Sequence, residues 1–198
     1  LWQSGQGGFG YGDGDDTTMI NPTISLYLRN EFSIIDTSEI GSLVFDIDFD
    51  DAFVAYLNDV EIARSNIGIY GDHPAYNQVA NTYKEAQIYQ GGSPDQFVVN
   101  SYLIDSVLRQ GSNVLSVQVH NQDISSSDLT ARVFLSLGIT SSTLNYSSPH
   151  PWFNPPLIFT SSNLPIVVIN TNNQNILDSA RIICDMGVID NGFGNLNS

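Results

Sequence analysis

The sequence has little positive charge, one cysteine and no long apolar run, and each shortage excludes a class of protein. Lys84 is the only lysine, and lysine plus arginine number 6 against 21 acidic residues, for a formal net charge of -15. Such a chain repels a phosphate backbone, so a nucleic-acid partner is set aside. Cys184 has no second cysteine with which to form a disulfide in this chain, and a free cysteine is usually buried. No apolar run approaches the roughly 18–20 residues of a membrane span.

The motifs of common catalytic sites are also missing. The sequence contains no G-x-S-x-G elbow, no P-loop, no glycine-rich dinucleotide motif and no H-E-x-x-H. His73, His120 and His150 are not at zinc-ligand spacing, so we predict a packed or hydrogen-bonded role for each. A glycosidase pair of carboxylates needs a cleft and one raised pKa, and neither is visible in a sequence. We therefore predict that the chain is not an enzyme.

The stretch Val44 to Arg64 contains the clearest structural pattern. Around its start, large apolar residues alternate with mostly acidic ones at a period of two, which predicts a strand with one buried face. The apolar positions are Leu43, Phe45, Ile47 and Phe49, and the positions between and after them are Val44, Asp46, Asp48 and Asp50. Asp50-Asp51-Ala52 predicts a turn into a second strand. Asn58-Asp59 between two apolar runs predicts a two-residue hairpin, because both residues tolerate positive φ.

Similar patterns along the chain predict about eight short strands. Alternation marks the stretches from Ile24 to Arg29, Val114 to His120 and Ala131 to Leu137, and we also interpret Thr82 to Tyr89 as a strand. Phe97 to Leu108 predicts a strand followed by a helical turn. Short strands separated by turns are typical of an all-β, antiparallel, jelly-roll-like β-sandwich.

Composition divides the chain into three parts. We predict a β-sandwich over 1–139, a Ser/Pro-rich linker with an aromatic anchor at Trp152-Phe153 over 140–163, and a strand-containing extension over 164–198. The extension contains the apolar strand Leu164 to Ile169 and an amphipathic piece around Ile176 to Met186. It is either the start of a following domain or an assembly arm.

The pattern D-D-x-F-V-A-Y-L-N-x-V-E-I-A-R-S-N, from Asp50 to Asn66, resembles the galactose-binding-like β-sandwich module of secreted bacterial CotH (spore-coat protein H-like) family proteins. Further matching segments are Gly10 to Asp16, Glu85-Ala86-Gln87, Tyr89 to Gly92, Asn113 to Asn121 and Ser126 to Leu129. Leu164 to Ile169 resembles the first strand of the domain that follows the module in that family. The sequence departs from the family at Ala52 and Asp59, where glycine is usual.

This resemblance implies a galactose-binding-like fold and an extracellular or cell-surface location in a bacterium. The kinase-like domain of the family lies downstream of the module, so its activity is not carried over to these residues. Abundant Asn, Ser, Thr and Gly agree with an extracellular protein.

Acidic residues gather at turns, which is how ligands of hard cations are usually distributed. The candidate metal ligands are Asp13, Asp15, Asp16, Asp50, Asp51 and Asp128. Calcium takes six to eight oxygen ligands from flexible turns, so we predict a structural calcium ion there. The alternative is that these carboxylates cap turns by accepting backbone N–H bonds.

Two kinds of partner remain open. A glycan could bind at the loop end of the sandwich, where the candidate residues are Tyr11, Tyr70, Tyr76, Tyr89 and Asn121. A homo-oligomer or homopolymer could form through an apolar strand with no evident partner, and its candidate residues are Leu164, Ile166, Val167, Val168 and Ile169. The two functional hypotheses are a self-associating surface or filament subunit and, alternatively, a calcium-stabilised carbohydrate-binding module of a larger secreted protein.

Overall fold

The computed structural model describes residues 2–140, 147–156, 161–171 and 181–198. The chain divides into two compact units, Leu1–Phe153 and Asn154–Ser198, and each is described by itself. Among the described residues, no helix is both long and apolar enough to cross a bilayer.

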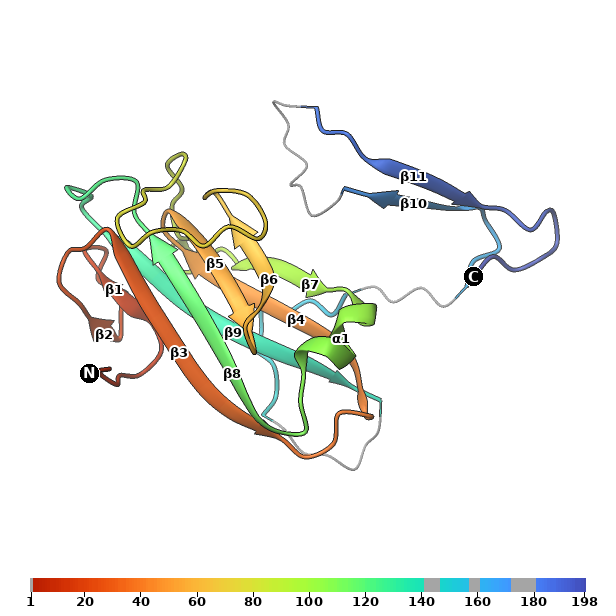
Figure 1. Cartoon of the computed structure of the whole chain (residues 1–198), viewed down its shortest axis with the longest axis horizontal. Helices are drawn as coiled ribbons and strands as arrows, with labels where there is room; N and C mark the ends of the chain where they lie inside the picture. The colour runs from red at the N-terminus through yellow and green to blue at the C-terminus, as the bar shows by residue number, and fades with distance from the viewer. Residues whose placement is uncertain (1, 141–146, 157–160, 172–180) are drawn as a thin grey trace. The chain divides into compact units, whose positions relative to one another are not determined.

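Two stacked sheets form the first unit (Figure 1). Its strands are β1 (Phe9–Tyr11), β2 (Thr18–Met19), β3 (Ser25–Ile34), β4 (Ile40–Phe49), β5 (Ala52–Leu57), β6 (Val60–Ser65), β7 (Asp95–Val99), β8 (Gly111–His120) and β9 (Leu129–Ile139). One sheet has the order β2-β1-β9-β4-β7 and the other the order β3-β8-β5-β6. All neighbours are antiparallel except β1 and β2, which are parallel. The predicted all-β antiparallel sandwich is confirmed.

Aromatic side chains from both sheets meet in the core. Phe45 and Phe49 of β4 pack against Phe53 of β5, with ring centroids 5.7 and 4.7 Å from that of Phe53. All three are fully buried, and each buried phenylalanine contributes roughly 1.5–3 kcal/mol. Since β4 and β5 belong to different sheets, these contacts hold the sheets together.

The hairpin between β5 and β6 is confirmed. Asn58 and Asp59 have positive φ values of 49° and 71°, and Leu57 pairs with Val60 across the turn. The buried Asn58 amide donates to the Val107 carbonyl at 2.7 Å. Val107 ends helix α1 (Ser101–Val107), so the predicted helical turn is also confirmed.

The predicted strand from Thr82 to Tyr89 is wrong. Only a short 3-10 helix, η1 (Ile88–Gln90), forms at its end. The backbone N–H groups of Gln87 and Ile88 donate to the two carboxylate oxygens of Asp48, at 2.7 and 2.8 Å. The carboxylate of Asp48 thus accepts the backbone N–H bonds that a neighbouring strand would accept in a sheet.

Strand β4 is buried on both faces, whereas the alternation of apolar and acidic residues in its sequence predicted a single buried face. Asp46 and Asp48 point away from the apolar core and are each 1% exposed. Asp48 accepts backbone N–H bonds from the segment before β7, and Gln96 of β7 itself donates to Asp46 Oδ1 at 3.1 Å.

The long connection after β6 packs on the outer face of the β3-β8-β5-β6 sheet. Ile67 and Ala80 of this connection form a small buried cluster with outward-facing residues of β5, namely Ala52, Val54 and Tyr56. The connection is therefore an ordered cover over the sheet.

Part of the predicted linker packs against β9. The rings of His150 and Trp152 are stacked, and Phe134 of β9 meets them edge-on at 4.7 and 4.9 Å. Trp152 therefore anchors this segment, as predicted.

The second unit contains an antiparallel pair, β10 (Ile166–Asn170) and β11 (Asp185–Ile189). The predicted apolar strand forms, but the expectation that it lacks a partner in this chain is wrong. Residues 176–180 of the predicted amphipathic piece, which runs from 176 to 186, lie outside the described residues. Cys184 is exposed, contrary to expectation, and the described residues of this unit form no apolar core around it.

Candidate functional site

Asp51 lies at the turn between β4 and β5 and joins three segments. Its Oδ1 accepts a hydrogen bond from the Lys84 backbone N–H, and its Oδ2 one from the Gln122 N–H, each at 2.8 Å. The residue is fully buried. Both oxygens thus have backbone donors, so Asp51 fits the turn-capping alternative rather than a metal ligand.

The neighbouring Asp50 belongs to a different group. Oxygen atoms of Asp50, Glu85 and Asp128 lie within 4.8 Å of one another. Asp50 comes from the β4–β5 turn, Glu85 from the segment before η1, and Asp128 from the loop before β9. Asp50 is 2% exposed, and its Oδ1 has no hydrogen-bond partner.

Burial raises the pKa of Asp50 to about 9, and the nearby Asp51, Asp128 and Glu85 carboxylates add to the shift. Desolvation and like charge both disfavour the ionised form. A positive charge among these groups would favour the ionised form and so oppose both effects.

Asp13, Asp15 and Asp16 form a second acidic group, again with oxygens within 4.8 Å of one another. Two members have partners, because Thr130 Oγ1 donates to Asp13 at 2.8 Å and Arg132 pairs with Asp15 at 3.4 Å. Both oxygens of Asp16 lack hydrogen-bond partners. Burial and the charges of Asp13 and Asp15 raise the pKa of Asp16 to about 7.

Glycine is required where β1 meets the two acidic groups. A Cβ atom on Gly10 would lie 2.0 Å from the Leu129 carbonyl oxygen, and one on Gly12 would lie 2.2 Å from the Ser127 carbonyl oxygen. Gly12 also has a φ of +105°. These close approaches bring the acidic stretch after β1 against the loop that carries Asp128.

The predicted tyrosines fall into two sets. Tyr70 and Tyr76, in the long connection, are 50% and 73% exposed. Tyr11 and Asn121 are buried, and the Asn121 amide donates to the Tyr11 hydroxyl at 2.9 Å. These two therefore lie beneath the surface. Tyr89 is exposed, and its hydroxyl donates to Glu85 Oε2 at 3.2 Å, which places it beside the Asp50 group.

The segment that carries Tyr70 is held by an ion pair. The Arg64 Nε donates to Glu61 Oε1 at 2.8 Å, and its Nη1 donates to the Ile67 carbonyl at 2.9 Å. The other Glu61 oxygen accepts the Gly71 backbone N–H at 2.9 Å. Both charged side chains are nearly buried, so the connection is fixed close to where Tyr70 emerges.

The same connection crosses the sheet toward β3. His73 stacks on Tyr56 of β5, with ring centroids 5.7 Å apart. The Tyr76 carbonyl accepts a hydrogen bond from Ser25 Oγ, at the start of β3, at 2.6 Å. Since β6 and β3 are the edges of a four-stranded sheet, this span crosses about 14 Å perpendicular to the strands, at about 4.8 Å per strand.

All three histidines have the packed or hydrogen-bonded roles predicted for them. His120 is buried, and its Nδ1 lies 2.8 Å from the Gln78 carbonyl oxygen. Burial lowers its pKa below the usual value. His73 and His150 stack on aromatic rings as described above.

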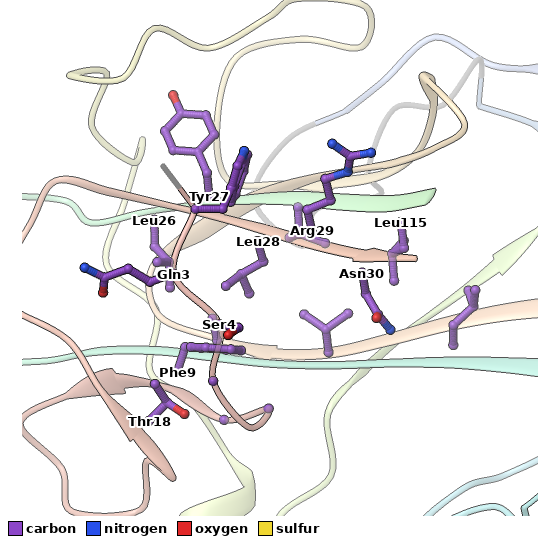
Figure 2. Close-up of a pocket in the computed structure, with 18 of the residues that line it drawn as sticks. Gln3, Ser4, Phe9, Thr18, Leu26, Tyr27, Leu28, Arg29, Asn30 and Leu115 are labelled. Atoms are coloured by element: carbon purple, nitrogen blue, oxygen red, sulfur yellow. The ribbon is translucent and has the colours of Figure 1, made fainter. Parts of the chain in front are cut away.

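A cavity of about 1020 Å³, lined by both polar and apolar side chains, opens between β3 and β9 (Figure 2). Leu26 and Leu28 of β3 line it together with Leu115, and Gln3 and Ser4 of the N-terminal segment cross it. None of the predicted metal, glycan or assembly residues lines this cavity.

Comparison with known proteins gives little further information. No protein-family model matches the chain, and no curated protein matches it significantly. The CotH-like resemblance therefore stays a prediction.

Two similar solved structures are enzymes of much greater length. The native α-L-rhamnosidase of Aspergillus terreus is 19% identical, with a TM-score of 0.36 over 62% of this chain and 13% of that one. The α-L-rhamnosidase of Streptomyces avermitilis complexed with L-rhamnose is 14% identical, with a TM-score of 0.39 over 71% of this chain and 12% of that one. At TM-scores below 0.5 these similarities establish no shared function.

Sequence reasoning missed Glu85. The prediction grouped six aspartates, whereas the structure forms two groups, places Asp51 in neither and adds Glu85 to the second. Glu85 did stand in one of the segments that resemble the CotH-like module, and this was the one sequence feature that pointed to it.

Proposed function

We propose that the chain contains a non-catalytic, extracellular β-sandwich module of a larger secreted protein, and that this module binds a carbohydrate. The observation that supports this most is the ordered connection over the outer face of the β3-β8-β5-β6 sheet, which leaves Tyr70 and Tyr76 exposed.

Tyrosine suits this role because its ring packs on the apolar face of a sugar while its hydroxyl group bonds to water or to sugar hydroxyls. The Glu61–Arg64 pair and the stacked His73 fix the connection before any ligand arrives. A fixed loop loses little conformational entropy on binding, which favours affinity. A crossing of about 14 Å perpendicular to the strands suits an extended oligosaccharide better than a single small sugar.

The test is binding of the full chain to the glycan that it retains best, measured by calorimetry. We expect Tyr70→Ala and Tyr76→Ala each to weaken binding roughly tenfold, or about 1.4 kcal/mol. Tyr102→Ala is the matched control, because Tyr102 is 74% exposed on α1 and lies outside the connection. Equal losses in all three variants would contradict the proposal.

A second candidate, self-association through the C-terminal strand, has one specific observation in its favour. Val167, Val168 and Ile169 of β10 are each about half exposed, at 55%, 48% and 55%. An isolated two-stranded hairpin is marginally stable in water, so covering these side chains would stabilise it. Head-to-tail contacts of this kind would propagate into a filament or ring.

Light scattering tests this candidate. We expect large species from the full chain that disappear when it is truncated after Ser161. Monomers in both samples would rule out assembly by this route.

A further inference from the structure

The group formed by Asp50, Glu85 and Asp128 brings three carboxylates from three distant segments within 4.8 Å of one another. Like charges this close repel strongly, more so away from water. We propose that these three residues bind a divalent cation, and that calcium is the ion their chemistry suits. This inference is independent of the proposed glycan site.

The hydrogen bonding of Asp50 supports a ligand more directly than the clustering of acids does. Its side chain is 98% buried, and Oδ1 faces no donor. Leaving a buried acceptor unsatisfied costs about 1–3 kcal/mol, and more when the group is charged. A cation beside Oδ1 would remove that cost.

Two neighbouring aspartates show what a purely structural carboxylate looks like in this protein. Asp48 and Asp51 are just as buried as Asp50, at 1% and 0% exposed. Each accepts backbone N–H bonds on both of its oxygens. Asp50 differs from both by keeping a buried oxygen without a partner. Asp46 also has such an oxygen, Oδ2, but it belongs to neither acidic group, whereas Asp50 has two carboxylates beside it.

Asn121 precedes Gln122, whose backbone N–H bonds to Asp51, so it lies at the same end of the sandwich as Asp50. Asn121 is fully buried, and its Oδ1 also has no partner. Its amide donates to the hydroxyl of Tyr11. Burial raises the pKa of this hydroxyl, and the nearby charges of Asp128 and Asp50 add to the shift. A neutral carbonyl oxygen of this kind is a common calcium ligand.

The donor set favours calcium over other metals. All the candidate ligands are oxygens, while His120 directs its Nδ1 to the Gln78 carbonyl. Zinc and copper prefer nitrogen or sulfur. Magnesium demands a tight octahedron, whereas calcium accepts irregular sets of six to eight oxygens. Ligands that come from three separate loops form an irregular set, which suits calcium better than magnesium.

The Asp13, Asp15 and Asp16 group is not included in this site. Thr130 and Arg132 bond to one oxygen each of Asp13 and Asp15, while the other oxygens of these two residues and both oxygens of Asp16 have no partner. The group nevertheless lacks a fully buried member such as Asp50, because all three of its residues are partly exposed.

Binding would join the β4–β5 turn, the segment before η1 and the loop before β9. Thermal unfolding of the full chain, first treated with a chelator and then given calcium chloride, tests this. At calcium concentrations about 100 times the dissociation constant we expect Tm to rise by about 5–10 °C. Magnesium at the same concentration should raise it less, and calorimetry should show calcium binding at this site.

Variants locate the ion. Glu85→Gln and Asp128→Asn should abolish the calcium-dependent rise in Tm, and Asp105→Asn, on the exposed face of α1, should retain it. Glu85 lies outside every strand, so its variant is expected to fold even if an Asp50 variant does not. Three results would overturn the proposal: no heat and no change in Tm with calcium, a full rise in both site variants, or a rise lost only in Asp16→Asn.

Discussion

Single carboxylates in this protein differ in role because they differ in hydrogen-bond partners, not in burial. Asp51 has a backbone donor on each oxygen, while Asp50, one residue earlier, has a buried oxygen with none. The bonds of Asp51 stabilise loops without a ligand, whereas the unpartnered oxygen of Asp50 would be stabilised by a positive charge. Adjacent residues of the same type thus serve different purposes.

The role of Asp51 can be tested without a ligand. In Asp51→Asn an amide NH₂ would replace one oxygen and face the backbone N–H of either Lys84 or Gln122. An unsatisfied buried donor costs about 1–3 kcal/mol, so we expect the free energy of unfolding in urea to fall by about 2 kcal/mol. Asp105→Asn should change it by less than about 0.5 kcal/mol. Equal stability of the Asp51 variant and the wild type would show that these bonds contribute nothing.

At this scale the sequence indicated the right residue types but not their grouping. The clustering of acids at turns drew attention to Asp50 and Asp128, two of the three residues whose carboxylates the fold brings together. Glu85 is separated from both by more than 30 residues, and only the folded chain brings the three together. Local spacing carries no information about such convergence.

Among the elements, the β5–β6 hairpin shows how a turn tolerates an unfavourable residue. Asp59 has a φ of 71° and is exposed, whereas glycine adopts such angles without steric cost. Asn58, the other turn residue, is buried and bonded to Val107, so it has a packing role that Asp59 lacks.

We therefore predict that Asp59→Gly stabilises the protein. The left-handed conformation costs a non-glycine residue up to about 1–2 kcal/mol, less for Asp, and part of this gain is offset by the greater flexibility of glycine in the unfolded chain. A net rise of about 0.5 kcal/mol in the free energy of unfolding is expected from urea titration. Asn58→Gly should be destabilising, because it removes the bond to Val107. A loss of stability in Asp59→Gly would contradict this interpretation of the turn.

Strands whose patterns are local were predicted well, and segments whose partners are distant were not. The alternation in β4 and the Asn-Asp turn depend on neighbouring residues, and both formed as expected. Thr82 to Tyr89 has a strand-like sequence, but its N–H groups bond to Asp48 and Asp51 instead of to a strand. The same contacts bury the second face of β4, which its alternation could not reveal.

For the whole molecule, the features that support the proposed functions lie in loops near the β4–β5 turn and on the outer face of the β3-β8-β5-β6 sheet. The turn at Asp50, the segment with Glu85 and the connection with Tyr70 and Tyr76 all come from loops between strands, while the strands supply the core. Asn66, at the start of the connection, donates to the Asp51 carbonyl at 3.0 Å, so the carboxylate turn and the tyrosine connection are joined. Loops positioned by a rigid scaffold are where binding residues usually lie.

The fold class was predictable because it follows from many short alternating strands, whereas the function depends on which loops meet. Carbohydrate binding through the exposed tyrosines is the central claim. Its most direct test is a glycan array probed with the full chain and with a Tyr70→Ala/Tyr76→Ala double variant, both in calcium. We predict selective retention of the wild type on extended oligosaccharides and loss of that retention in the double variant. Binding to no glycan by the wild type, or unchanged binding by the double variant, would contradict the claim.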